Sequence, residues 1–71
     1  MPLTMVETGK RVRLVSIAGG RRLRMRLAEL GLVPGTEIDV INNSLHGPFI
    51  LGVRGSRIAL GRGMAFKIMV E

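Results

Sequence analysis

The feature that most constrains this chain is a stretch in which a helix ends and a strand begins within a few residues. Apolar residues at Leu23, Leu27 and Leu30 recur at i, i+4 and i+7, which predicts one apolar stripe on a helix over residues 21–30. Gly31 follows this stripe directly. Glycine adopts the left-handed conformation that ends many helices without a Cβ clash, so we expect Gly31 to cap the helix with a positive φ.

A turn and a strand follow the helix. Pro34 cannot continue a helix, and Pro34 followed by Gly35 is typical of the central positions of a type II turn. Residues 36–40 then alternate between polar and apolar side chains, which predicts a half-buried strand. At the other end, Gly19 and Gly20 separate the helix from an earlier strand pattern and open the helix.

Further strand patterns are separated by residues that form turns. We expect strands over residues 10–17, 36–42, 49–54, 57–60 and 65–70, with the helix between the first two. The connections are expected to be a short lead-in over residues 1–8, a loop over 42–48, a tight hairpin at Gly55-Ser56 and a turn over 61–63. This order predicts a mainly β fold of about five strands with one helix between strands 1 and 2. We expect the bent antiparallel sheet to close into a small barrel without exposed strand edges.

The same alternation, together with the helical stripe, predicts the residues of one hydrophobic core. The predicted members are Val12, Leu14, Leu23, Leu27, Leu30, Ile38, Val40, Ile58, Leu60, Ile68 and Val70.

Length and composition restrict the class of protein. The chain of 71 residues predicts one domain, residues 1–71, and it has no cysteine, which fits a reducing cytoplasm. It has neither an apolar run of roughly 18 residues nor a signal-peptide pattern, so we expect a cytoplasmic protein. Eleven Lys and Arg residues against five Asp and Glu residues give a net charge of +6. That charge favours anionic partners, or it merely keeps a small apolar protein soluble.

Catalytic and metal-binding patterns are weak. The chain has a single histidine, His46, and its serines have no visible base nearby in sequence. Its acidic residues do not cluster, so we expect no catalytic residues, no metal site and no cofactor. We expect Glu29 to form a surface ion pair with Arg26, three residues before it.

The helix carries an unusual charge pattern. Arg21, Arg22 and Arg24 lie at its start, where the helix dipole favours anions, and Arg22 and Arg26 are like charges at i,i+4. Met25 adds an adaptable apolar side chain to the face away from the leucine stripe. We therefore predict that Arg22, Met25 and Arg26 contact a partner. The alternative is that the arginines are solvated and their stems cover apolar surface. The loop over residues 42–48 is the next candidate surface.

Nucleic-acid binding is a second functional class that the charge allows. The two aromatic residues, Phe49 and Phe66, both lie in strand patterns, whereas base stacking needs exposed rings. The lack of Tyr and Trp also disfavours a groove for proline-rich peptides.

One run of residues carries a family resemblance. Arg26-Leu27-x-Glu29-Leu30-Gly31-Leu32-x-Pro34-Gly35 is a long and fairly specific motif, and Gly47-Pro48, Ile58-Ala59-Leu60 and Ala65-x-x-Ile68-x-Val70 follow it in order. Over residues 9–70 the chain resembles FeoA, the small companion of the FeoB ferrous-iron transporter, and the SH3-like C-terminal domain of iron-dependent repressors. Gly61-Arg62-Gly63 departs from the family pattern.

The resemblance implies an SH3-like barrel and a non-enzymatic accessory protein of ferrous-iron uptake that binds the cytoplasmic part of a FeoB-like permease. In that case the permease would recruit the protein to the inner face of the membrane. The alternatives are a nucleic-acid-binding small barrel and a metal-sensing regulatory domain.

Overall fold

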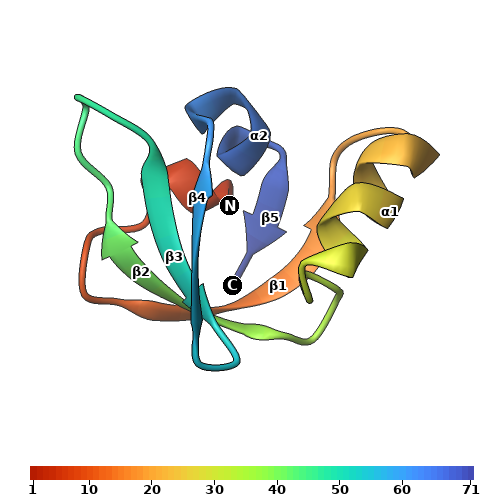
Figure 1. Ribbon diagram of the computed structural model, residues 1–71, viewed down its shortest axis with the longest axis horizontal. Coiled ribbons are helices and arrows are strands. Elements are labelled where there is room, and N and C mark those ends of the chain that lie inside the picture. Colours follow the sequence, from red (N-terminus) through yellow and green to blue (C-terminus); the bar gives the residue numbers. More distant parts are fainter.

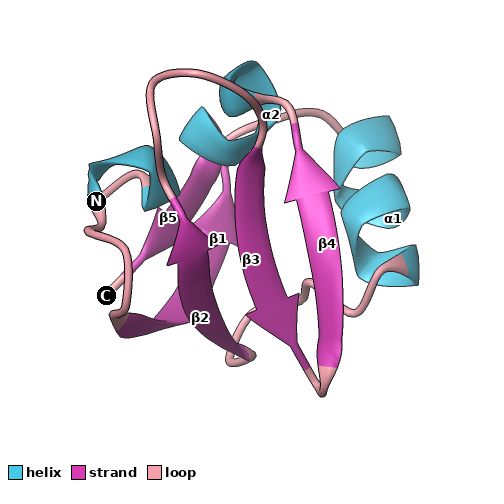
Figure 2. Ribbon diagram, turned by 60° about the vertical axis from the view of Figure 1, so that its left-hand side comes forward, coloured by secondary structure: helices cyan, strands magenta, loops and turns pink.

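The chain forms a bent five-stranded antiparallel sheet in the strand order β4-β3-β2-β1-β5 (Figures 1 and 2). A computed structural model describes residues 1–71. The elements, in chain order, are η1 (Leu3–Met5), β1 (Arg11–Ile17), α1 (Arg21–Glu29), β2 (Glu37–Asn42), β3 (Phe49–Val53), β4 (Ser56–Leu60), α2 (Arg62–Phe66) and β5 (Ile68–Val70). The expected mainly β fold, with α1 between β1 and β2, is confirmed.

Strand β1 bends the sheet because its two halves pair with different neighbours. Residues 11–13 pair with β2, whereas Leu14, Ser16 and Ile17 pair with β5. The register shifts between Leu14 and Ser16, as it does in a β-bulge, which adds local twist. The sheet does not close fully. Strands β4 and β5 are its two edges and α2 connects them, so the expectation that closure removes every edge is wrong (Figure 1).

The end of α1 is a Schellman motif, as the glycine at position 31 predicted. Gly31 has a φ of 89°. Its N–H donates to the carbonyl of Ala28 at 2.9 Å, and the N–H of Leu32 donates to the carbonyl of Leu27 at 2.9 Å. These are the two bonds that satisfy the last carbonyls of a helix. Leu27 and Leu32 are both fully buried, so the cap also joins two core side chains.

The predicted turn after α1 and the predicted start of α1 at Gly20 are also confirmed. The N–H of Thr36 donates to the carbonyl of Val33 at 3.1 Å, and Gly35 has a φ of 93° at the third position of the turn. This is a type II turn with Pro34 at its second position. At the other end, Gly20 is the N-cap residue, and its carbonyl accepts the N–H of Arg24 at 3.1 Å.

The core is one cluster of fourteen buried apolar residues. Seven of the predicted core residues belong to it, and Val12, Leu23 and Ile58 pack against it while partly buried. Leu30 is 45% exposed, so its predicted core position is wrong. The helix ends at Glu29 and Leu30 is the C-cap residue, so the leucine stripe stops before it. The buried residues outside the predicted list are Leu3, Val6, Leu32, Phe49, Leu51, Val53 and Ala65.

The N-terminal segment is part of the fold. Residues 1–8, expected to be a lead-in, contain η1, and they bury Leu3 and Val6. Pro2 forms a β-bridge with Met69, and the N–H of Val70 donates to the carbonyl of Met1 at 2.7 Å. The segment therefore packs against the C-terminal strand, which sequence periodicity could not reveal.

The expected fifth strand is too long. Residues 62–66 form α2, and β5 begins only at Ile68. The carbonyl of Gly61 accepts the N–H of Ala65 at 3.0 Å, which closes a helical turn where we expected a chain reversal. Phe66 is 58% exposed, so it does not share a core face with Ile68 and Val70.

The hairpin between β3 and β4 is shifted by one residue from its predicted place. Arg54 and Gly55 have φ values of 50° and 80°. Positive φ at both central positions is the mark of a type I′ turn. Ser56 is then the first residue of β4, and it pairs with Val53.

Candidate functional site

Charged side chains divide between two regions of the surface. On β1 and β2, Arg11 Nε lies 2.7 Å from Asp39 Oδ1, and Arg11 Nη1 lies 3.4 Å from Glu37 Oε2. Arg13 Nη1 lies 3.9 Å from Glu71 Oε1. The hydrogen bond to Asp39, together with the charges of Asp39 and Glu37, raises the pKa of Arg11. These pairs are exposed and neutralise one region of the sheet.

The other arginines form no ion pair. They lie on α1, the β3–β4 hairpin, β4 and α2, namely Arg21, Arg22, Arg24, Arg26, Arg54, Arg57 and Arg62. Two of them bond carbonyl oxygens instead. Arg24 Nη1 donates to the carbonyl of Gly19 at 2.7 Å, and Arg62 Nη1 donates to that of Ser44 at 2.9 Å. The arginines without an acidic partner therefore lie on α1, on β4 and on the segments at either end of β4.

The outward face of α1 brings the predicted contact residues together. Arg22, Met25 and Arg26, with Arg21 and Glu29, line an open depression of about 590 Å³. We call these five residues the α1 face. Met25 is 54% exposed, whereas Leu27 on the inward side is fully buried. Glu29 forms no ion pair, so its predicted bond to Arg26 is wrong.

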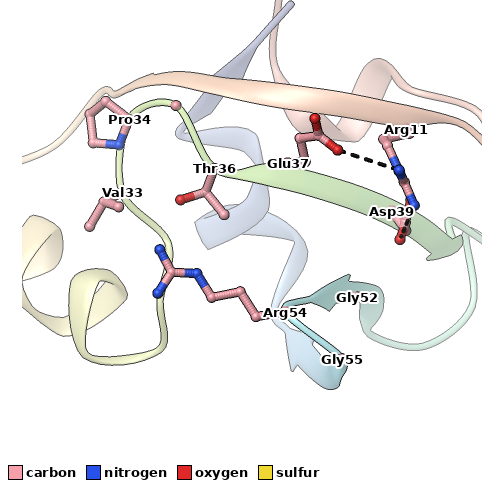
Figure 3. Close-up of a pocket in the computed structure, with 10 residues that line it drawn as sticks. Arg11, Val33, Pro34, Thr36, Glu37, Asp39, Gly52, Arg54 and Gly55 are labelled. Carbon is pink, nitrogen blue, oxygen red and sulfur yellow. Dashed lines mark hydrogen bonds and ion pairs between the residues drawn. The ribbon is translucent and has the colours of Figure 1, made fainter.

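A second depression of about 540 Å³ lies between the Val33–Thr36 turn and the β3–β4 hairpin. Figure 3 shows the side chain of Arg54 extending from the hairpin toward this turn, with Arg11, Glu37 and Asp39 on the other side. The Arg54 guanidinium forms no ion pair. Sequence reasoning missed this cleft, although an arginine followed by a glycine between two strand patterns could have marked the hairpin.

The remaining sequence candidates lie apart. His46 is exposed in the loop after β2, and no three His, Asp or Glu side chains converge on one point. The loop is tied to the N-terminal segment, because Asn43 Nδ2 donates to the carbonyl oxygens of Thr4 at 3.0 Å and Val6 at 2.7 Å. Phe49 is fully buried, which leaves Phe66 as the one exposed aromatic ring. No helix has the length and apolar character that crossing a membrane requires.

The fold and the charge distribution together define a small SH3-like barrel with one strongly basic helix, α1. Comparison with known proteins identifies the family: the chain matches the FeoA domain over residues 1–71. It is 41% identical over 70 residues to a protein of Methanocaldococcus jannaschii with the provisional name Fe(2+) transport protein A. That match covers 99% of this chain and 84% of the relative. The chain therefore belongs to the FeoA family.

Solved structures agree with this assignment. The crystal structure of an iron uptake regulatory protein, FeoA, superposes with a TM-score of 0.88 at 38% identity, covering 99% of this chain and 92% of the other. The zinc complex of Stenotrophomonas maltophilia FeoA, described as an SH3 domain protein, shares the fold with a TM-score of 0.86 at 24% identity, over 100% of this chain and 89% of that one. The crystal structure of T. acidophilum IdeR matches with a TM-score of 0.85 at 25% identity, over 99% of this chain and 32% of that chain. The expected resemblance to repressor domains is confirmed.

Proposed function

We propose that this protein is a non-enzymatic accessory protein of ferrous-iron uptake, which acts in the cytoplasm by binding the cytoplasmic part of a FeoB-like permease. Membership of the FeoA family and the name of the M. jannaschii relative support the role in Fe²⁺ transport. Ferrous iron is the cargo of that process. No three His, Asp or Glu side chains of the chain lie close enough together to hold a metal ion.

The observation that carries the proposal is the α1 face. Arg22 and Arg26 lie four residues apart on one helix without an acidic partner, which folding alone does not favour. Met25 lies between them and is more than half exposed. An apolar anchor surrounded by arginines is typical of the centre and rim of a protein interface. We propose that this face contacts an acidic surface of the permease.

The two kinds of side chain have different expected effects on binding. Charges at the rim mainly change the rate of association and its dependence on salt, whereas a buried apolar anchor mainly changes the rate of dissociation. Replacing Arg22 and Arg26 together by Glu should therefore slow association most at low salt. Met25→Asp should speed dissociation at any salt concentration.

The test is kinetic binding, measured by surface plasmon resonance, to the permease's soluble cytoplasmic domain and to the full-length permease in detergent. Matched controls lie elsewhere on the chain. Lys10→Glu together with Lys67→Glu, both at exposed positions, produces the same net charge as the double replacement of Arg22 and Arg26. Met5→Asp, at a methionine that is 66% exposed in η1, is the control for Met25→Asp. Far-ultraviolet circular dichroism verifies that each variant is folded. If folded α1-face variants bind the permease and support iron uptake like the parent, the contact lies elsewhere, with the loop over residues 42–48 next.

A further inference from the structure

Strand β4 is an unpaired edge of the sheet, and its outward side faces a groove. On one side β4 pairs with β3 along its whole length, from Ser56 opposite Val53 to Leu60 opposite Phe49. The two-residue turn makes Val53 and Ser56 a hydrogen-bonded pair, and such pairs alternate along an antiparallel ladder. Ile58 and Leu60 therefore also bond to β3.

The intervening residues, Arg57 and Ala59, direct their backbone N–H and C=O groups away from the sheet. Both residues are exposed, and no loop or helix donates to or accepts from their backbone. Two donors and two acceptors, spaced two residues apart, are thus open on one side of β4. An edge of this kind pairs readily with another extended chain.

The space beside this edge of β4 is a partly apolar groove. A groove of about 380 Å³ lies between the second half of α1, the end of β4 and α2, as Figure 2 shows for these elements. Leu30, Ala59, Leu60 and Met64 line it, with Arg26 and Glu29 at its α1 side. Leu30, which is 45% exposed and does not belong to the core, forms part of this wall.

We infer that the β4 edge is a docking site for an extended acidic segment of a protein partner, which would add to the sheet as a sixth strand beside α1. Main-chain hydrogen bonds to Arg57 and Ala59 would hold the segment. Alternate side chains would point in opposite directions, apolar ones into the groove and acidic ones toward solvent near Arg57. This inference goes beyond the proposed function, since it does not depend on the identity of the partner.

Charge distinguishes an acidic partner from a second copy of the chain. Arg26 lines the groove and Arg57 lies on β4, both without ion-pair partners, and the groove's single carboxylate is Glu29. Two copies joined at β4 would bring two molecules of net charge +6 together, which opposes association. An acidic segment satisfies both the open backbone groups and the unpaired arginines.

The probe is a short blocked peptide in which glutamate alternates with valine, titrated into the ¹⁵N-labelled full chain. Chemical-shift changes are expected on β4 and on the facing residues of α1. Two matched peptides isolate the mechanism. N-methylation of the amides on one edge of the peptide should weaken binding about tenfold while methylation on the other edge should not, because strand addition uses one edge only. A lysine–valine peptide should not bind.

A matched pair of variants tests the protein side. Ala59→Pro removes the outward N–H without removing a bond to β3, and proline is tolerated on edge strands. It should weaken binding about tenfold, whereas Ala59→Val, which retains the N–H, should not. If Ala59→Pro does not fold, the N-methylated peptides still decide the question.

Three results would overturn the inference: no binding of the acidic peptide, shift changes away from β4, or equal binding of both N-methylated peptides. Dimerisation of the free chain in sedimentation experiments, abolished by Ala59→Pro, would show instead that the edge serves a second copy. The proposed contact with the permease is tested by α1-face variants, so either proposal can fail alone.

Discussion

The stability of this protein should depend on Leu27 far more than on Leu30, although both belong to the same apparent stripe in the sequence. Leu27 is fully buried, whereas Leu30 is 45% exposed. Removing a fully buried leucine side chain loses its transfer free energy and leaves a cavity, so Leu27→Ala should lower the free energy of unfolding by about 2–5 kcal/mol. At Leu30 roughly half of the apolar area is already in water, and the loss should be about 1 kcal/mol or less.

The assay is urea unfolding followed by far-ultraviolet circular dichroism, because the chain has neither Trp nor Tyr for intrinsic fluorescence. In a domain of this size, 1 kcal/mol shifts the melting temperature by about 4–8 °C, so Leu27→Ala should lose roughly 10 °C or more. The dependence of the free energy on urea should stay unchanged if only packing is lost. Equal destabilisation by Leu27→Ala and Leu30→Ala would refute the assignment of the buried helix face.

Three further outcomes can be measured with the isolated protein. Gly31→Ala should lower the free energy of unfolding by about 1 kcal/mol, because the φ of Gly31 is 89°. Gly63→Ala should raise it by up to about 1 kcal/mol, because Gly63 lies inside α2 with open space around it. If urea unfolding shows the opposite order, the Schellman cap at Gly31 is contradicted. Arg54→Asn should raise the melting temperature, because asparagine before glycine suits the type I′ turn better than arginine does. A lower melting temperature would show that the Arg54 side chain makes a stabilising contact. Anaerobic calorimetry with Fe²⁺ should detect no submicromolar site, because no three ligating side chains converge, and stoichiometric tight binding would disprove this.

Local chemistry explains which parts of the fold were predictable. The Schellman cap at Gly31 and the type II turn at Gly35 each depend on residues within one short segment, so composition and spacing sufficed. The N-terminal segment was missed because it packs against residues far away in the sequence: η1 contacts α2 and β5, and Pro2 forms a bridge with Met69. The residues next to Leu3 in the sequence show no pattern that predicts packing against the C-terminal part of the chain.

Helix α2 was missed for a different reason. Phe66, Ile68 and Val70 continue a period of two back through the end of a short helix, so a strand pattern extends over residues that are helical. The α1 face was predictable because helical spacing alone places Arg22, Met25 and Arg26 together. The β4 edge was not, since it depends on which strands pair and on the absence of a partner beyond β4.

The α1 face and the β4 edge are adjacent, and Arg26 borders both. A partner held at the α1 face therefore brings its neighbouring residues close to the open backbone groups of Arg57 and Ala59. Binding of a second segment then becomes intramolecular, with an effective concentration that reaches the millimolar range for a short flexible connection. A strand addition that is weak for a free peptide can thus add substantially to the affinity of one partner. Glu37 and Asp39 of β2 are already paired with Arg11 of β1, whereas the arginines of α1 and β4 have no acidic partner. Both proposed contacts would therefore use arginines that no acidic side chain of the protein neutralises.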